Sequence, residues 1–193
     1  MGAIIVGSGP SLRKYKKMPE DQTVICVNQS IAFVNRCDHW FTIDPTPINI
    51  RTMQENREGV TYWCATDRSV RLPNHVNRLP LVKENPKNQK ERRFKGRFAK
   101  AGLDERFFHI STGNSAYGAL NLAYHLGERK AVLIGVDATR ESKLDGNRSR
   151  DLSHVPLLFS SAARQMDIAS CGKLRSQDII HMNFQEGLEW LRT

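Results

Sequence analysis

The stretch Ala3-Ile4-Ile5-Val6-Gly7-Ser8-Gly9-Pro10-Ser11-Leu12 decides the fold class of this chain. Its first four residues form a short, continuous apolar run, which is typical of a buried strand. The two glycines that follow allow a tight turn, and a proline in the first turn of a helix costs no hydrogen bond. The stretch therefore predicts a strand, a turn and a short helix over residues 11–17.

The same order of strand, turn and helix repeats along the 193 residues. We expect further strands at residues 23–27, 40–43, 60–64, 107–110, 131–136 and 178–181. We expect helices at residues 46–56, 115–126, 155–169 and 185–191. Continuous apolar strands that alternate with helices predict an α/β fold: a single Rossmann-like domain over residues 1–193, with a mostly parallel open sheet and helices on both faces.

Composition and charge limit the classes of function. Apolar residues make up 39% of the chain and charged residues 25%, which is typical of a globular protein and not of a disordered one. The net charge of +9 favours an anionic partner, such as a nucleotide or a nucleic acid. Between Lys83 and Arg106 nine Lys or Arg residues stand against four acids, with Phe94 and Phe98 among them. This basic insertion is interpreted as a lid or a DNA-docking loop, and a solvated surface loop is the alternative.

Several other classes are not indicated by the sequence. No apolar run approaches the roughly 20 residues of a membrane span, and the N-terminus lacks the basic region of a signal peptide. The cysteines lack C-x-x-C spacing, and no Asp-x-Asp pair follows a strand, so we expect no metal site. We expect a cytoplasmic protein with reduced thiols. The cysteines are Cys26, Cys37, Cys64 and Cys171.

The ends of the predicted strands carry the candidate ligand site. In open parallel sheets, ligands bind beyond the carboxyl ends of the strands, so small and polar residues there are candidates. They are Gly7, Ser8, Gly9, Asn28, Asp44, Ser111, Thr112, Gly113, Asn114 and Asp137.

Each of these turns also has a simpler structural interpretation. The glycines of the first turn would let backbone N–H groups approach a phosphate, but Leu12 replaces the third glycine of the dinucleotide-binding motif. Small hydroxyl residues before the predicted helix 115–126 can hold an anion, or Thr112 or Asn114 caps that helix. Asp44, which precedes Pro45, could likewise be a helix N-cap.

His154 is the candidate general base. It lies in a polar loop before the predicted helix 155–169, and an imidazole can accept a proton near neutral pH. The alternative is a solvated residue at a helix start. The remaining histidines are interpreted as structural or surface residues: His39, His75, His109, His125 and His181.

Together these motifs resemble those of a known group of enzymes. The chain has Gly-x-Gly-Pro-Ser-Leu after the first strand, an Asn after the second, Trp-Phe-x-x-Asp-Pro in the third, then Ser-Thr-Gly-x-x-Ala and a strand that ends in Gly-Val-Asp. Their order resembles the bacterial lipo-oligosaccharide sialyltransferases and their wider relatives, which include motility-associated glycosyltransferase-like proteins and phage proteins. The resemblance covers residues 2–45 and 107–140.

The resemblance implies a Rossmann-like domain with a lid, a CMP-sugar donor, a His base and no metal. By motif, Asn28 and the turn at Thr112-Gly113 would contact the nucleotide, Asp137 would close the pocket, and His154 would be the base. In the family, tyrosines after the Gly-x-Asp strand bind the leaving phosphate. Here the strand is followed by Ala138-Thr139-Arg140, and the cations Arg140, Arg148 or Arg150 could replace the tyrosines.

The sequence therefore predicts a metal-independent, glycosyltransferase-like enzyme. It would move a sugar from a nucleotide-sugar donor, used as a co-substrate, to an anionic acceptor such as a phage DNA base or a surface glycan. The first alternative is a non-catalytic nucleotide- or DNA-binding module of the same fold. The second is a nucleotide-sensing or pyrophosphokinase-type enzyme.

Overall fold

The computed structural model describes residues 2–15, 17–82, 101–147 and 152–193. Within them, the strands are β1 (Gly2–Val6), β2 (Thr23–Val27), β3 (His39–Thr42), β4 (Thr61–Ala65), β5 (Asn77–Leu79), β6 (Lys130–Ile134), β7 (Asp167–Ser170) and β8 (Ile180–His181). The α-helices are α1 (Pro47–Glu55), α3 (Ser115–His125), α4 (Val155–Ala162) and α5 (Phe184–Arg192). Two 3-10 helices, η1 (Pro10–Lys14) and η2 (Asn28–Phe33), complete the set.

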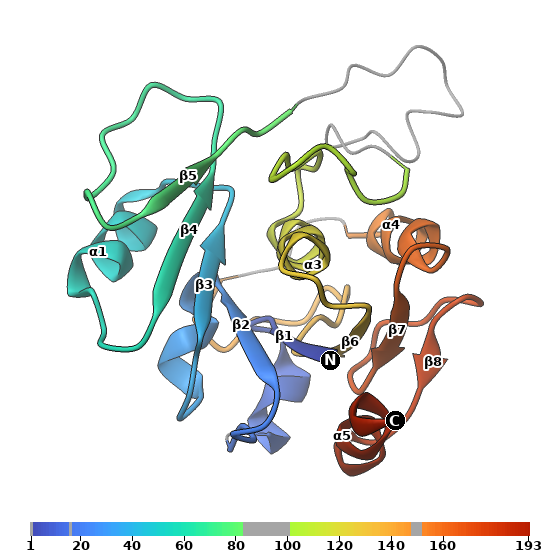
Figure 1. Cartoon of the computed structure of the whole chain (residues 1–193). Coiled ribbons are helices and arrows are strands. Elements are labelled where there is room, and N and C mark those ends of the chain that lie inside the picture. Colours follow the sequence, from blue (N-terminus) through green and yellow to red (C-terminus); the bar gives the residue numbers. More distant parts are fainter. Residues whose placement is uncertain (1, 16, 83–100, 148–151) are drawn as a thin grey trace.

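The strands form one sheet in the order β5-β4-β3-β2-β1-β6-β7-β8, and neighbouring strands are parallel throughout (Figure 1). The chain moves outward from β1 to β5, returns to β6 on the other side of β1, and then moves outward again to β8. The strand order therefore reverses between β1 and β6. In sheets of this type, the crevice for a ligand lies at the carboxyl ends of the strands beside such a reversal.

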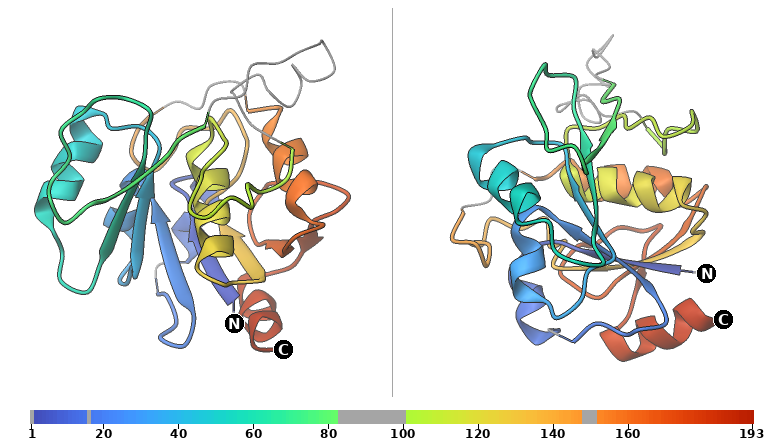
Figure 2. Two further views of the ribbon diagram at one scale, coloured as in Figure 1. Left: turned by 45° about the horizontal axis from the view of Figure 1, so that its top comes forward. Right: turned by 60° about the vertical axis from the view of Figure 1, so that its left-hand side comes forward.

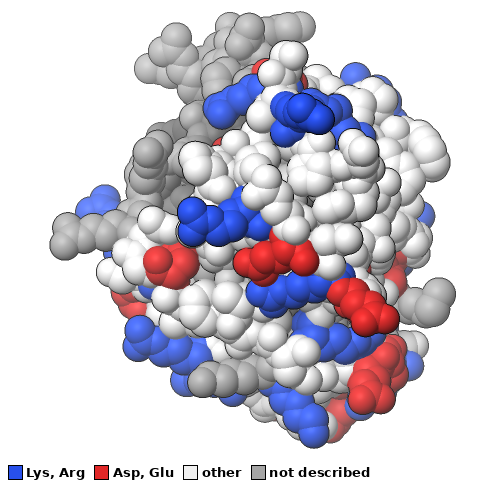
Figure 3. Space-filling model, turned by 90° about the vertical axis from the view of Figure 1, so that its left-hand side faces the viewer, with Lys and Arg blue, Asp and Glu red and all other residues white. Residues whose placement is uncertain are grey.

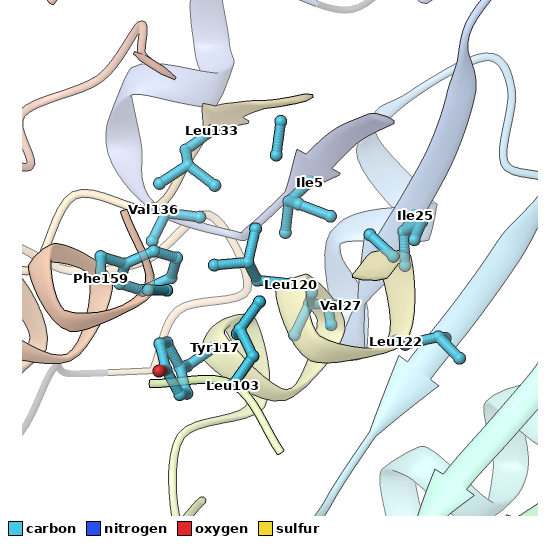
Figure 4. Packing of buried hydrophobic residues seen from close by; sticks show 14 of the residues in the cluster. Ile5, Ile25, Val27, Leu103, Tyr117, Leu120, Leu122, Leu133, Val136 and Phe159 are labelled. Carbon is cyan, nitrogen blue, oxygen red and sulfur yellow. The ribbon is translucent and has the colours of Figure 1, made fainter. Parts of the chain in front are cut away.

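Successive side chains of β1 enter two separate cores. Ala3 and Ile5 belong to the core under α3 and α4, whereas Ile4 and Val6 belong to the core that includes residues of η1, α1 and α5. Figure 2 shows these helices on opposite sides of the sheet, and Figure 4 shows the packing of the first core. Burial on both faces explains why the strands are continuous apolar runs. The architecture confirms the predicted fold class.

Two predicted elements are wrong. Residues 107–110 do not form a strand: Phe108 has a φ of 50°, which a strand does not allow, and only Ile110 makes a bridge, to Leu81. The predicted helix 155–169 ends at Ala162, and its last three residues belong to β7, which begins at Asp167. Its apolar run fits either structure, because a short buried strand and a buried helical segment have the same composition.

The sequence also missed the short edge strand β5, and the helix predicted after the first turn is the 3-10 helix η1. The basic insertion falls largely at residues 83–100, which lie outside the described residues, as do Arg148 and Arg150. On the face over α1 and β5, Lys and Arg side chains are interspersed with Asp and Glu (Figure 3). No helix in the described part of the chain has the length and apolarity needed to cross a bilayer.

Candidate functional site

A cavity of about 180 Å³ lies where the strand order reverses, at the carboxyl ends of β1, β2 and β6. The sequence predicted this edge of the sheet as the ligand site, and the structure brings many of the predicted residues together there. The predicted residues in the cavity wall are Gly7, Ser8, Gly9, Asn28, Asp44, Gly113, Asn114 and Asp137. The predicted residues outside the wall are Ser111, Thr112, Arg140 and His154.

The turns after β1 and β6 cross in direct backbone contact. A Cβ atom on Gly7 would lie 2.4 Å from the carbonyl oxygen of Gly135, and one on Gly135 would lie 2.1 Å from the carbonyl oxygen of Gly7. Gly135 also has a φ of 63°, which favours glycine. The amides of Gly7 and Gly9 donate to the carbonyls of Ile134 and Gly135, each at 2.8 Å. These two amides therefore hold the crossing together and do not face a ligand.

Asp137 is a structural member of the cavity wall. Its side chain is buried, its Oδ2 atom accepts from the amide of Ser11 at 2.8 Å, and its Oδ1 atom accepts from the amide of Lys173 at 2.9 Å. Both carboxylate oxygens therefore bind backbone N–H groups. Asp137 joins the start of η1 to the segment after β7, and thereby fixes the floor of the cavity.

Asn28 is held with its side-chain nitrogen as the remaining donor. It has a φ of 54°, a conformation that asparagine tolerates better than most residues. Its Oδ1 atom accepts from Thr42 Oγ1 at 2.7 Å and from Asn49 Nδ2 at 3.3 Å, and its carbonyl accepts from Trp40 Nε1 at 2.6 Å. Since the oxygen is occupied, Asn28 offers N–H donors to a ligand.

Asn49 on α1 supports this side of the cavity, and the sequence analysis did not identify it. Its buried amide donates to the carbonyl of Asp44 at 2.7 Å and to Thr42 Oγ1 at 3.1 Å, and it accepts from Gln29 Nε2 at 3.0 Å. The only signal in the sequence was a polar residue on the inward face of a helix. The role of Asn49 becomes evident only from the packing of α1 beside η2.

Asp44 is exposed in the cavity wall, unlike Asp137. Its Oδ2 atom lies 3.5 Å from Ser115 Oγ, at the start of α3. Asp44 is not the N-cap of α1, because Thr46 Oγ1 accepts from the amide of Asn49 instead. The carboxylate of Asp44 is therefore available to a ligand hydroxyl.

The N-terminus of α3 opens into the cavity. Asn114 caps the helix, since its Oδ1 atom accepts from the amide of Tyr117 at 3.0 Å, and Thr112 Oγ1 accepts from the amide of Asn114 at 3.0 Å. Both residues therefore cap the helix or its preceding turn, which is the structural interpretation of this stretch, and Asn114 also lines the cavity. Ser115 and Ala116, in the first turn of α3, line the cavity as well. The unpaired amides of a first helical turn carry partial positive charge, which suits an anion.

An ion pair between the buried Asp104 and the exposed Arg106 fixes the segment that leads into this turn. The carboxylate of Asp104 accepts hydrogen bonds from Arg106 and from the hydroxyl of Ser111. Burial raises the pKa of Asp104, but the bonds from Arg106 and Ser111 outweigh this effect and hold it well below its usual range. Asp104 also donates its amide to Asn121 on α3 at 3.0 Å. Ser111 therefore acts beneath the cavity wall and not in it.

His154 begins α4, and its carbonyl accepts from the amide of Leu158 at 3.2 Å. Leu152 before it in the chain and Val155 after it both line the cavity. His154 itself lies outside the wall. Arg140, which follows wall residue Thr139, is exposed and also lies outside it.

Three polar wall residues were absent from the sequence-based site: Ser115, Thr139 and Lys143. Lys143 lies in the loop after β6, whose length and polarity give no indication of where it packs. Groups of three or more His, Cys, Asp or Glu residues able to hold a metal ion are absent from the described residues.

No family model matches this chain, and no curated protein matches it. Among solved structures, the chain is similar to the sialyltransferase CST-II, determined in complex with a trisaccharide acceptor and CMP. The identity is 18%, the TM-score is 0.42, and the match covers 86% of this chain and 75% of that chain. A likeness of this size concerns the fold alone, and the roles of residues are not carried over from it.

Proposed function

We propose that this protein is a glycosyltransferase-like enzyme that binds a nucleotide-sugar donor in the cavity and transfers the sugar to an anionic acceptor without a metal. The observation that carries the proposal is the convergence of the Asn28 amide, the Asp44 carboxylate and the N-terminus of α3 on one cavity at the reversal of strand order. This location is where open α/β sheets bind nucleotides.

The wall offers a different chemistry to each part of a nucleotide. The side-chain N–H groups of Asn28 can donate to carbonyl or ring-nitrogen acceptors of a base or to ribose oxygens. The exposed carboxylate of Asp44 can accept from a ribose hydroxyl. The first-turn amides of Ser115 and Ala116 can donate to a phosphate. The glycine turn after β1 contributes close backbone packing, because its Gly7 and Gly9 amides are already bonded.

The transfer step needs a base for the proton of the acceptor hydroxyl, and that base is His154. The acceptor hydroxyl oxygen attacks the anomeric carbon, and the bond from that carbon to the phosphate oxygen breaks with its electron pair moving to the phosphate. His154 accepts the hydroxyl proton. Its neighbours in the chain, Leu152 and Val155, line the cavity, which supports this role.

The test measures binding and transfer separately. The thermal stability of the wild type is measured with CMP, CDP, UDP, GDP, ADP and TDP, and transfer is assayed with the sugar nucleotides of each that binds. His154→Ala is expected to keep the nucleotide-induced rise in Tm while transfer falls by about 10²- to 10⁴-fold. His181→Ala, on the far edge strand β8, is the matched control and should retain both.

The outcomes separate the alternatives. If no nucleotide raises the Tm of the wild type, the cavity is not a nucleotide site and the proposal fails. If a nucleotide binds but no sugar is transferred, the non-catalytic binding module replaces the enzyme. If transfer survives in His154→Ala, the enzyme stands and the assignment of the base is wrong.

A further inference from the structure

Lys143 is the one cation among the described residues that line the cavity. Two carboxylates share the wall with it, but Asp137 is engaged by two backbone amides and Asp44 lies against Ser115. In the described part of the chain, neither acid forms an ion pair with Lys143. The positive charge of Lys143 is therefore available to a ligand in the cavity.

The loop that carries Lys143 is fixed to the turn after β1. The amide of Leu144 donates to the carbonyl of Ser8 at 2.8 Å, and Ser8 Oγ lies 3.5 Å from Asp145 Oδ2. The loop also closes on itself, because the amide of Lys143 donates to the carbonyl of Asn147 at 2.9 Å. Ser8 thus has a definite role: it anchors the loop that places Lys143 in the wall.

A second group of donors contributes to the same cavity. The first turn of the eleven-residue helix α3 contributes Ser115 and Ala116 to the wall. A helix N-terminus and a lysine that share one small cavity form a site for a single anionic group. Donors held in place before the ligand arrives stabilise charge without a reorganisation cost.

The other cations of this region are placed differently. Arg140 is exposed and lies outside the wall, and Lys173 pairs with Glu141. Among the described residues, the cation that serves the cavity is therefore Lys143, although the sequence had favoured the arginines that follow β6.

We propose that Lys143 binds the phosphate of the donor nucleotide and stabilises the negative charge that grows on it as the nucleotide leaves. This inference rests on the proposed function. The ammonium group donates to a non-bridging phosphate oxygen. When the bond from the anomeric carbon to the phosphate breaks, the electron pair moves to the phosphate, and the adjacent positive charge offsets it. A lysine can fill this role, because a compact positive charge is sufficient and no particular arrangement of donors is required.

The experiment compares each nucleoside monophosphate with its own nucleoside. Binding of CMP and cytidine, and of UMP, GMP and AMP with their nucleosides, is measured by calorimetry. The proteins are the wild type, Lys143→Met, Lys143→Gln and Lys143→Arg. The matched control is Lys17→Met, which removes an equal charge from an exposed position outside the cavity wall. Urea denaturation of each variant verifies that it is folded.

The expected result is a phosphate-specific loss. The wild type should prefer one monophosphate over its nucleoside, and Lys143→Met and Lys143→Gln should reduce this preference by about 10- to 100-fold. Affinity for the nucleoside should not change. Lys143→Arg should retain most of the preference, and Lys17→Met should retain all of it.

Three results would overturn the inference while the nucleotide site stands. The preference could survive in both Lys143→Met and Lys143→Gln, or fall equally in Lys17→Met, or the nucleoside could lose as much affinity as the monophosphate. If the wild type binds neither nucleotides nor nucleosides, the proposed function itself fails, which is a distinguishable outcome.

Discussion

Asp44 and Asp137 each follow a strand and each line the cavity, yet the structure uses them in opposite ways. Asp137 is buried, and both of its oxygens accept backbone N–H groups. Asp44 is exposed, and its carboxylate has one contact, with Ser115 Oγ at 3.5 Å. Two identical residues at equivalent strand ends therefore differ in function because one is enclosed by crossing backbone and the other faces the cavity.

The difference extends to the two sides of the cavity. The β1/β6 side is built from backbone: Gly7 and Gly135 touch, and the amides of Gly7 and Gly9 donate to the carbonyls of Ile134 and Gly135. The β2/β3 side is built from side chains, with Asn28, Thr42 and Asn49 in one network. We expect substitutions on the β1/β6 side to reduce folding stability. We expect substitutions on the β2/β3 side to weaken ligand binding.

The largest expected effect is on the backbone side. Gly7→Ala places a methyl group against the carbonyl of Gly135, and neither backbone can move without breaking β1 or β6. The free energy of unfolding should fall by at least about 3 kcal/mol, measured by urea denaturation.

The control for this variant is Gly127→Ala, at a φ of 93° with open space around the added Cβ. It should lose only about 1–2 kcal/mol, from backbone strain alone. Equal losses in the two variants would show that the contact between the turns is not what demands glycine at position 7.

The second test exchanges the two acids for amides. Asp137→Asn removes one acceptor and turns an NH2 group toward a backbone N–H, so it should cost about 2–3 kcal/mol of stability. Asp44→Asn should change stability by less than about 0.5 kcal/mol and weaken nucleotide binding, seen by calorimetry. If Asp44→Asn is the more destabilising of the two, Asp137 is not the structural member of this pair of acids.

A smaller effect is expected at Asp104, a third carboxylate that lies outside the cavity. Its pKa in the folded protein is below the ordinary value of 3.8, so its stabilisation is present above about pH 4 and is lost as the pH falls further. Asp104→Asn should lower the free energy of unfolding by about 1–2 kcal/mol at pH 7. The gap between wild type and variant should narrow below pH 4, measured by urea denaturation across pH 2–7. If the difference in the free energy of unfolding between wild type and variant stays constant with pH, the ionised Asp104 carboxylate is not the source of the stabilisation.

The sequence predicted most strands because buried parallel strands are continuous apolar runs that end at small or polar residues. Val24–Val27 and Ala131–Ile134 are such runs, and each is buried throughout. The same rule failed at residues 107–110, where an apolar run forms a turn over α3, with Phe108 against Trp63 and His125. Phe107 is 81% exposed and only Ile110 of this run is fully buried, so apolar composition alone fixed neither burial nor an extended backbone here.

Sequence order alone determined which edge of the sheet carries the site, because parallel strands bring every strand-to-helix turn to the same edge. That placed Gly7, Asn28, Asp44 and Asp137 at one cavity before any side chain was positioned. Only the tertiary structure decided what each residue offers there. The hydrogen bonds that occupy Asp137 and orient Asn28 come from segments distant in the chain, and the docking of its loop on Ser8 puts Lys143 into the wall.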